Sequence, residues 1–226
     1  MIVLPHDLDL PDRDTVLRQT ASFDRARWIP KLPDAAWWPP TVLDTCPLVG
    51  KWPRVDRRTV FSSARTADTV EGRRQLFVAA LVWGTGTKAR SVDRRAQIFR
   101  HSPGTDIDAR LDVALKTLRE RGATEAYWAL NNDQHIPYLG AAFFTKVLYF
   151  AGHESPTGPY RPLILDSVVS QALKDLKAVG ADWPENGWTT DQYRQYLEGV
   201  HHLAQRRGVL PDQVEAALFF HGKQLP

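Results

Sequence analysis

The stretch from His135 to Val169 constrains the fold of this chain more than any other part of the sequence. Four of its residues recur at spacings of 4, 3 and 4, so on a helix their side chains share one stripe: Leu139, Phe143, Lys146 and Phe150. Burying an ammonium group among apolar side chains is costly, and one response is a lowered lysine pKa, which a nucleophilic amine needs. The alternative is that the stem of Lys146 packs along the stripe while its charged end reaches water.

Asp166 lies between a short aliphatic segment that follows Pro162 and a second helical pattern. The apolar residues of this pattern share one helix face: Leu165, Val168, Val169, Ala172, Leu173 and Leu176. The pattern therefore predicts Asp166 at a helix N-terminus, where aspartate is a favoured cap that contributes about 1 kcal/mol without any chemistry. An aspartate in that position can also hold its charge against a cationic centre.

These residues resemble the helix-hairpin-helix (HhH-GPD) superfamily of DNA glycosylases, and within it the 8-oxoguanine DNA glycosylase branch. That family carries a nucleophilic lysine on the second helix of the hairpin, then a Gly/Pro-rich loop and a catalytic aspartate. The resemblance implies that Thr145-Lys146-Val147 supplies the lysine, residues 152–162 the loop, and Asp166 the aspartate. The hairpin departs from the family pattern, because only Gly140 stands where two glycines usually flank a hydrophobic residue. We therefore expect a longer or differently shaped turn.

The resemblance implies a DNA glycosylase that flips a modified base out of the duplex and excises it. In that reaction Lys146 attacks the sugar, while Asp166 stays ionised, stabilises the positive charge that develops there and helps to keep the lysine neutral. A Schiff base formed in this way would allow AP-lyase strand cleavage. The resemblance implies 8-oxoguanine first. A hypermodified phage base, such as glucosylated hydroxymethylcytosine removed in antiphage defence, is a second candidate, and the sequence does not choose between repair and defence.

The last predicted helix, 212–221, resembles the C-terminal helix of 8-oxoguanine glycosylases. There a glutamine reads the Watson–Crick edge of the flipped base and a phenylalanine stacks on it. Glu215 and Phe219 occupy those places, one turn apart on one face, and form the predicted base pocket. A carboxylate only accepts hydrogen bonds, so Glu215 suits an edge that presents donors, as in a guanine-type base or the N4 amine of cytosine. The alternative is an exposed surface glutamate.

Two further segments are predicted to contact DNA. The first is the hairpin, with Tyr138, Leu139, Gly140 and Thr145. The second is the turn after a helix predicted over 66–82, which lies where the family carries residues that fill the gap left by the flipped base: Trp83, Gly84, Thr85, Gly86, Thr87 and Lys88. The gap-filling role stays open among Trp83, Thr85, Thr87 and Lys88. Arginine pairs at 57–58, 73–74, 94–95 and 206–207 either form a basic face for phosphates or are ordinary solvated surface.

Helical patterns joined by short loops predict an all-α body with the helix-hairpin-helix glycosylase fold over residues 63–226, and no strand pattern of convincing length appears anywhere in the chain. Residues 1–62 are expected to form an irregular, Pro/Trp-rich N-terminal arm packed on that body, so that the whole is one compact domain. The arm contains a short predicted helix from Pro11 to about Phe23. The resemblance to the glycosylases covers roughly residues 66–222.

Composition excludes several classes of protein. A single cysteine, Cys46, excludes an internal disulfide and a four-cysteine iron–sulfur cluster. The seven histidines are scattered and suggest no metal site, so no metal and no cofactor are predicted. No apolar run approaches membrane-spanning length, so we expect a cytoplasmic monomer without a membrane partner, bound to double-stranded DNA that contains a modified base.

Two alternatives remain from the sequence alone. One is a non-catalytic helix-hairpin-helix DNA-binding module that kept the hairpin and lost the chemistry. The other is an unrelated helical protein in which Lys146 and Asp166 lie far apart.

Overall fold

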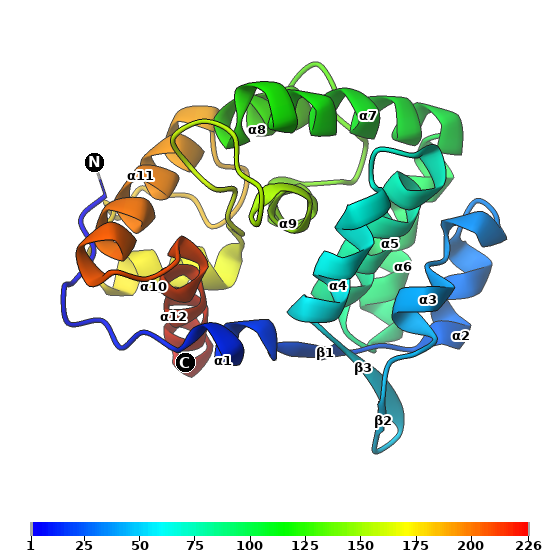
Figure 1. Ribbon diagram of the computed structural model, residues 1–226, viewed down its shortest axis with the longest axis horizontal. Helices are drawn as coiled ribbons and strands as arrows, with labels where there is room; N and C mark the ends of the chain where they lie inside the picture. The colour runs from blue at the N-terminus through cyan, green and yellow to red at the C-terminus, as the bar shows by residue number, and fades with distance from the viewer. Residues whose placement is uncertain (1, 226) are drawn as a thin grey trace.

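Helix α9 (Ala141–Gly152) forms the centre of the molecule and is viewed end-on in Figure 1. The computed structural model describes residues 2–225. Four helices pack against α9: α4 (Arg57–Ser63), α5 (Val70–Thr85), α7 (Gly104–Arg121) and α8 (Ala123–Asn131). Most α9 residues are consequently buried, including Lys146. No helix within the described residues has the length and apolar character needed to cross a membrane.

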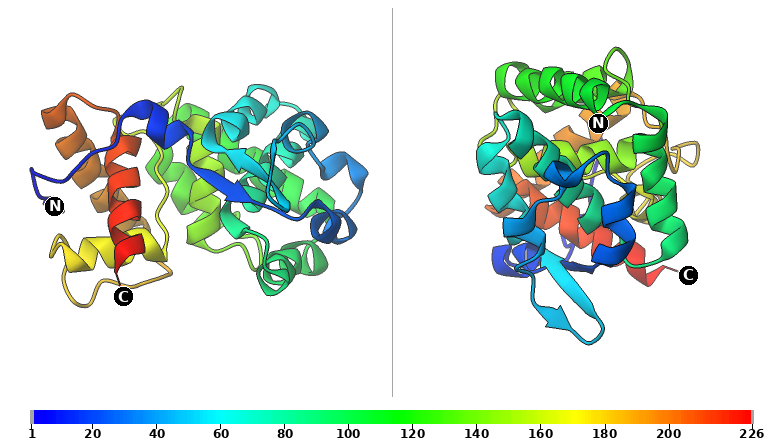
Figure 2. Two further views of the ribbon diagram at one scale, coloured as in Figure 1. Left: turned by 90° about the horizontal axis from the view of Figure 1, so that it is seen from below. Right: turned by 90° about the vertical axis from the view of Figure 1, so that its right-hand side faces the viewer.

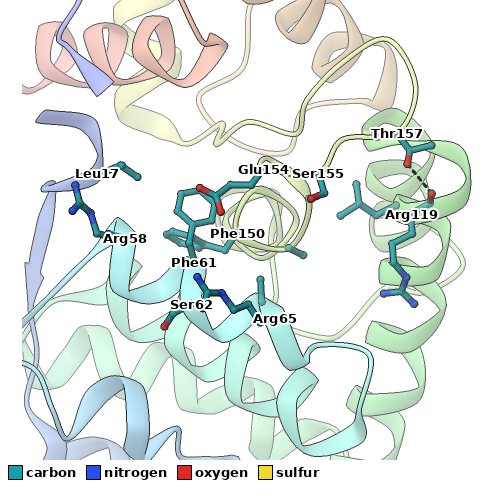
Figure 3. Close-up of a pocket in the computed structure, with 14 residues that line it drawn as sticks. Leu17, Arg58, Phe61, Ser62, Arg65, Arg119, Phe150, Glu154, Ser155 and Thr157 are labelled. Atoms are coloured by element: carbon teal, nitrogen blue, oxygen red, sulfur yellow. Dashed lines mark hydrogen bonds between the residues drawn. The ribbon is translucent and has the colours of Figure 1, made fainter. Parts of the chain in front are cut away.

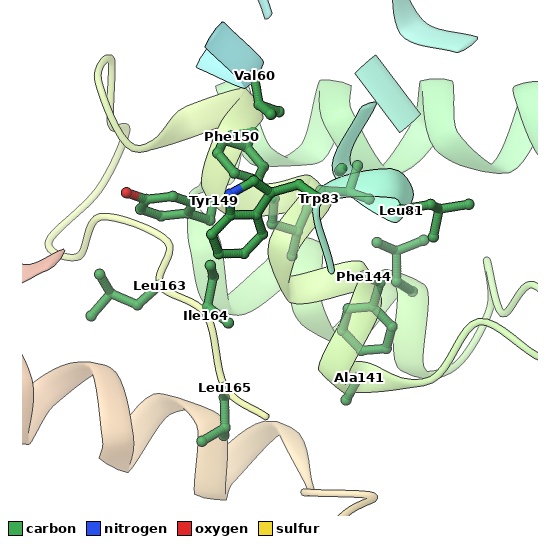
Figure 4. Packing of buried hydrophobic residues seen from close by; sticks show 14 of the residues in the cluster. Val60, Leu81, Trp83, Ala141, Phe144, Tyr149, Phe150, Leu163, Ile164 and Leu165 are labelled. Carbon is green, nitrogen blue, oxygen red and sulfur yellow. The ribbon is translucent and has the colours of Figure 1, made fainter. Parts of the chain in front are cut away.

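A second group of helices lies on the other side of α9 from α4 and α5 (Figures 1 and 2): α10 (Ser167–Asp175), α11 (Thr190–Arg207) and α12 (Pro211–Gln224). Helix α12 packs against both α10 and α11. Residues 162–165, the last part of the segment that leads from α9 to α10, are buried, and Figure 4 shows Leu163, Ile164 and Leu165 among the core residues near Trp83 and Tyr149. Helix α6 (Ala89–His101) packs against α5.

The N-terminal arm consists of short elements: α1 (Arg13–Leu17), α2 (Arg25–Trp28), η1 (Ile29–Lys31), η2 (Ala35–Trp37) and α3 (Pro40–Leu43). Figure 2 shows the arm running from the α11–α12 side of the molecule across to the α4–α6 side. The predicted boundary at residue 62 falls inside α4, which packs against both α5 and α9. Division of the chain into arm and body at that residue stays a prediction.

A small antiparallel sheet in the arm corrects two predictions. Strand β3 (Trp52–Asp56) lies between β1 (Thr20–Ser22) and β2 (Leu48–Val49). The expectation of no strands was therefore wrong for this region, and the helix predicted from Pro11 to Phe23 ends at Leu17. The cause is tertiary, because residues 20–22 satisfy their backbone groups on a strand more than 30 residues away, which no local pattern reveals.

In the body, every regular element from residue 63 to 225 is a helix, which confirms the all-α prediction. Helix α5 begins at Val70 and not at Thr66, because the side chain of Thr69 accepts a hydrogen bond from the amide of Gly72 and residues 64–66 form the 3-10 turn η3. Helix α9 begins at Ala141, so Leu139 is buried in the hairpin turn and does not lie on the helical stripe.

Candidate active site

Lys146 and Asp166 meet in the interior of the protein. The Nζ atom of Lys146 lies 2.8 Å from Oδ2 of Asp166 and donates a second hydrogen bond, also 2.8 Å long, to the carbonyl of Ala142. Lys146 is only 5% exposed, so its charged end does not reach water. The geometry excludes both the solvent-seeking lysine and the alternative in which these two residues lie far apart.

Asp166 is a helix cap and a charged partner at once. Its Oδ1 accepts hydrogen bonds from the amides of Val168 and Val169, both at 3.2 Å, while its Oδ2 faces Lys146. Burial acts to raise the pKa of Asp166, but the Lys146 ammonium and the two amides outweigh it and hold the pKa below its ordinary value. The carboxylate therefore stays ionised at neutral pH.

Thr145 connects the helix that carries the lysine to the segment that carries the aspartate. Its side chain is fully buried, donates to the carbonyl of Ala141 at 2.7 Å and accepts from the amide of Leu165 at 3.3 Å. The residue before Asp166 is thus held against α9. Thr145 was predicted to contact DNA, but the structure places it in the core, where it sets the distance between Lys146 and Asp166.

The hairpin end of α9 opens into a cavity of about 570 Å³, which we call the hairpin cavity. Arg94 and Arg95 of α6 line it together with residues 138–144 of the hairpin. Gly140 is the N-cap of α9, and no side chain of the described residues caps this helix. The amides of Phe143 and Phe144 donate to the carbonyl of Gly140, so those of Ala141 and Ala142 are left to bind an anion. Of the four arginine pairs, Arg94–Arg95 is the one at this cavity. Arg57 and Arg73 are buried, so the four pairs do not form one solvated basic face.

The ring of Phe143 contacts one cation that lines the hairpin cavity, Arg95, and also the buried Lys146. The guanidinium carbon of Arg95 is 4.1 Å from the centre of its ring, and Nζ of Lys146 is 5.3 Å away. Both distances fall within the range of cation–π attraction. Phe143 is half-buried, and Ser167, adjacent to Asp166, also lines the hairpin cavity. The cavity therefore lies next to the Lys146–Asp166 pair.

The hairpin turn itself, residues 132–140, contains an unusual backbone position. Tyr138 has φ +66°, in the left-handed region that glycine occupies easily and tyrosine rarely does. Its side chain is 54% exposed and packs against His101, with the ring centres 4.5 Å apart and the rings tilted by 33°. The structure thus presents an aromatic ring at the hairpin despite the backbone strain, which supports Tyr138 as a candidate DNA contact.

This strain gives a testable prediction. Tyr138→Gly is expected to be more stable than Tyr138→Ala by about 1 kcal/mol, because both lose the ring and only glycine relieves the left-handed backbone. Both variants should bind duplex DNA more weakly than wild type. Urea unfolding measures the first effect and fluorescence anisotropy with a labelled duplex the second. Wild-type affinity in both variants would remove Tyr138 from the DNA interface.

The turn predicted to fill the gap in the DNA is only partly at the surface. Trp83 is buried, with its ring 5.2 Å from the Arg57 guanidinium carbon and edge-on to Phe150 at 5.4 Å (Figure 4). A buried indole is not placed to enter DNA. The gap-filling candidates that retain surface exposure are Thr85, Thr87 and Lys88.

Glu215 is fully buried and forms a two-pronged ion pair with Arg57, which is itself fully buried. Nη1 of Arg57 lies 2.6 Å from Oε2, and Nη2 lies 3.2 Å from Oε1. Burial raises the pKa of Glu215, and Arg57 offsets part of that rise; the charges of Asp166 and Lys146 also act on it. The exposed-glutamate alternative is therefore wrong. Phe219, one turn later on α12, is half-buried.

Arg57 is a site residue that the sequence did not indicate. It lies 158 residues from Glu215 and belongs to the arm, and no local pattern distinguishes it from the exposed Arg58 beside it. The one local signal is Asp56, whose side chain accepts a hydrogen bond from the amide of Thr59 and caps α4. This cap makes Arg57 the first residue of the helix.

A second cavity, of about 450 Å³, opens at the C-terminal end of α9 (Figure 3). Arg58, Arg65 and Arg119 surround an apolar floor that includes Phe61 and Phe150. The C-terminal ends of α4, α7 and α9 all line this cavity, and basic side chains near helix C-termini interact favourably with the carbonyl ends. Arg65 and Arg119 are placed for that interaction, whereas Arg58 lies in the first turn of α4 and pairs with Asp14. Lys146 and Asp166 do not line this cavity.

Comparison with known proteins adds one match. A family model with the description "Putative 8-oxoguanine DNA glycosylase OGG-like protein" matches residues 14–219. The matched segment includes Arg57, Lys146, Asp166 and Glu215. Neither the curated proteins nor the solved structures contain a match to the chain.

Proposed function

The chain belongs to the OGG-like family of 8-oxoguanine DNA glycosylase relatives, and on that premise we propose that it excises a modified base with Lys146 as nucleophile and Asp166 as its charged partner. Membership of the family makes it a DNA glycosylase at the level of reaction class. The observation that carries the finer proposal is the buried contact of 2.8 Å between Nζ of Lys146 and Oδ2 of Asp166. A binding module that had lost the chemistry would have no need to bury this pair beside the hairpin cavity.

In the proposed reaction the nitrogen of Lys146 forms a bond to C1′ of the flipped nucleotide while the bond from C1′ to the base breaks. The electron pair of the broken bond leaves with the base, which takes up one proton from the lysine nitrogen. Asp166, ionised and 2.8 Å away, stabilises the positive charge on the sugar and nitrogen as the bonds exchange. Opening of the sugar ring moves a second proton from nitrogen to O4′ and leaves a Schiff base.

Lyase activity is the further step of this proposal. Loss of a C2′ proton from the Schiff base expels the 3′ phosphate, so excision would be coupled to strand cleavage. A glycosylase without this step would release the abasic strand intact. Strand breaks that form without added alkali therefore separate the two cases.

We propose that the hairpin cavity binds the DNA backbone. The uncapped N-terminus of α9 offers amides to a backbone phosphate, and Arg94 and Arg95 add positive charge. Phe143 and Ser167 also line this cavity. Phe143 contacts Lys146, and Ser167 follows Asp166 in the sequence. A phosphate held there would place its nucleotide close to Lys146.

For the base, the family favours 8-oxoguanine, and Glu215 favours any base edge that presents hydrogen-bond donors. Arg57 already supplies two donors to Glu215, so a base must share or displace one of them. A modified cytosine offers its N4 amine to the same carboxylate. Excision of a glucosylated hydroxymethylcytosine would place the enzyme in antiphage defence, whereas 8-oxoguanine would place it in repair.

Incubation with three DNA substrates tests the proposal: a duplex with one 8-oxoguanine, phage DNA carrying glucosylated hydroxymethylcytosine, and unmodified duplex. We expect alkali-labile sites in one modified substrate and none in the unmodified control. The responsive substrate identifies the base. Salt-sensitive binding of all three duplexes without any abasic site would instead support the non-catalytic module.

A further inference from the structure

Gly84 lies in the last turn of α5, directly opposite the candidate nucleophile on α9. A Cβ atom built at Gly84 would be 2.8 Å from Cδ and 3.1 Å from Cε of Lys146. It would also be 3.0 Å from Cε1 of Phe143. Real Cβ atoms essentially never approach a neighbour at less than 3.0 Å, so any side chain at this position must move the lysine or the phenylalanine.

The backbone offers no other reason for glycine at this position. Gly84 lies within the helix, and it is absent from the glycines with positive φ, unlike Gly86, which ends α5 at φ +78°. Glycine inside a helix is less favourable than alanine, because it loses more conformational freedom on folding. The sequence therefore keeps a destabilising residue where alanine fits the backbone but not the space beside Lys146.

That space contains the stem of Lys146. Its ammonium is held at two points, by Oδ2 of Asp166 and by the carbonyl of Ala142, each at 2.8 Å. The stem passes Gly84 on one helix and its ammonium lies 5.3 Å from the ring centre of Phe143 on the other. With the ammonium held at one end and the backbone at the other, a methyl group at Gly84 forces the stem to bend and weakens its contact with Asp166.

We propose that Gly84 is a positioning residue for the nucleophile: its missing side chain leaves the channel that directs Lys146 to Asp166. The role rests on the proposed function, since Gly84 acts only through Lys146. It replaces the expectation from the sequence that Gly84 contacts DNA. A methyl group at Gly84 requires the Lys146 stem to shift by some tenths of an ångström, because Cδ would lie 2.8 Å from the added Cβ. Displacement of a reacting group by about 1 Å can cost roughly 10²-fold in rate, so a smaller shift of the nucleophile also lowers the rate.

The test is Gly84→Ala, compared with Glu71→Ala on the exposed first turn of the same helix. We expect single-turnover excision by Gly84→Ala to fall roughly 10²-fold with unchanged DNA affinity. The helix propensity gained with alanine opposes the cost of weakening the buried contact between Lys146 and Asp166, so urea unfolding checks that the variant remains folded. Glu71→Ala should excise at the wild-type rate. Wild-type excision by Gly84→Ala, or a loss of rate matched by an equal loss of DNA affinity, would overturn the proposal.

A second readout does not depend on glycosylase activity. Reductive methylation with formaldehyde and cyanoborohydride, followed by peptide mass spectrometry, reports how accessible the Lys146 amine is in the folded protein. Gly84→Ala should label Lys146 several-fold faster than wild type, because the displaced ammonium leaves Asp166. Faster labelling in a protein that excises no base would reject the proposed function and retain the positioning role. Unchanged labelling would reject the positioning role whatever the activity.

Discussion

Lys146→Gln is expected to lower base excision by roughly 10³-fold or more and to abolish covalent trapping by borohydride. Borohydride reduces a Schiff base to a stable amine, so an adduct forms only when a protein nitrogen is bonded to the sugar. Glutamine is one bond shorter than lysine and keeps an N–H donor, but its amide nitrogen is not nucleophilic. Single-turnover excision and trapping on the end-labelled responsive duplex measure both effects.

Asp166→Asn separates the nucleophile from its partner. Asparagine is also a favoured N-cap, so α10 should keep its start while the negative charge is lost. Excision should fall, because charge on the sugar is no longer stabilised, yet the adduct should still form slowly through Lys146. Urea unfolding of both variants checks that each remains folded. An adduct at the wild-type level in Lys146→Gln would place the nucleophile elsewhere.

The positions of Lys146 and Asp166 could be predicted from the sequence because the two residues are close in the chain and each follows a local rule. The spacing of apolar residues placed Lys146 on a helix, and the switch from aliphatic segment to helical pattern placed Asp166 at a cap. Only the contact between the two side chains required knowledge of the three-dimensional structure. Leu139 shows the limit of periodicity, since the same spacing continued past the start of α9 into the turn.

The rest of the site depends on partners that are distant in sequence. The ion pair of Arg57 and Glu215 joins residues 158 positions apart, and β1 finds its partner strand across the arm. The sequence around Gly84 also gives no sign of the role proposed for it, because that role depends on the side chain that a neighbouring helix places beside it. Local sequence patterns indicate helix faces and helix caps. They do not indicate which buried charged residues form an ion pair with each other.

The second large effect concerns that ion pair. Arg57→Met is expected to lower the free energy of unfolding by about 3–5 kcal/mol, because it leaves the carboxylate of Glu215 buried without its partner. It also removes the hydrogen bond of 3.0 Å to the hydroxyl of Tyr149, which in turn donates to Asp212. Arg58→Met is the matched control, since the Arg58–Asp14 pair is exposed and should contribute at most about 1 kcal/mol.

The loss of unfolding free energy in Arg57→Met should also depend on pH, and the direction of that dependence can be predicted. Burial already raises the pKa of Glu215 in the presence of Arg57, and without that guanidinium the pKa rises further. A carboxyl whose pKa is raised on folding is destabilising above its unfolded pKa, so the deficit of Arg57→Met should be larger at about pH 8 than at about pH 5. Urea unfolding at the two pH values measures it, and a deficit independent of pH would contradict an unpaired Glu215.

Replacing both partners separates stability from base recognition. A buried ion pair exchanged for apolar residues of similar volume is often neutral in stability, so Arg57→Met/Glu215→Met should recover most of what Arg57→Met loses. If Glu215 reads the base, this stable double variant should still lose excision of the responsive base while binding duplex DNA normally. If it excises at the wild-type rate, the ion pair only connects the arm to α12, and the base is recognised at the hairpin cavity instead.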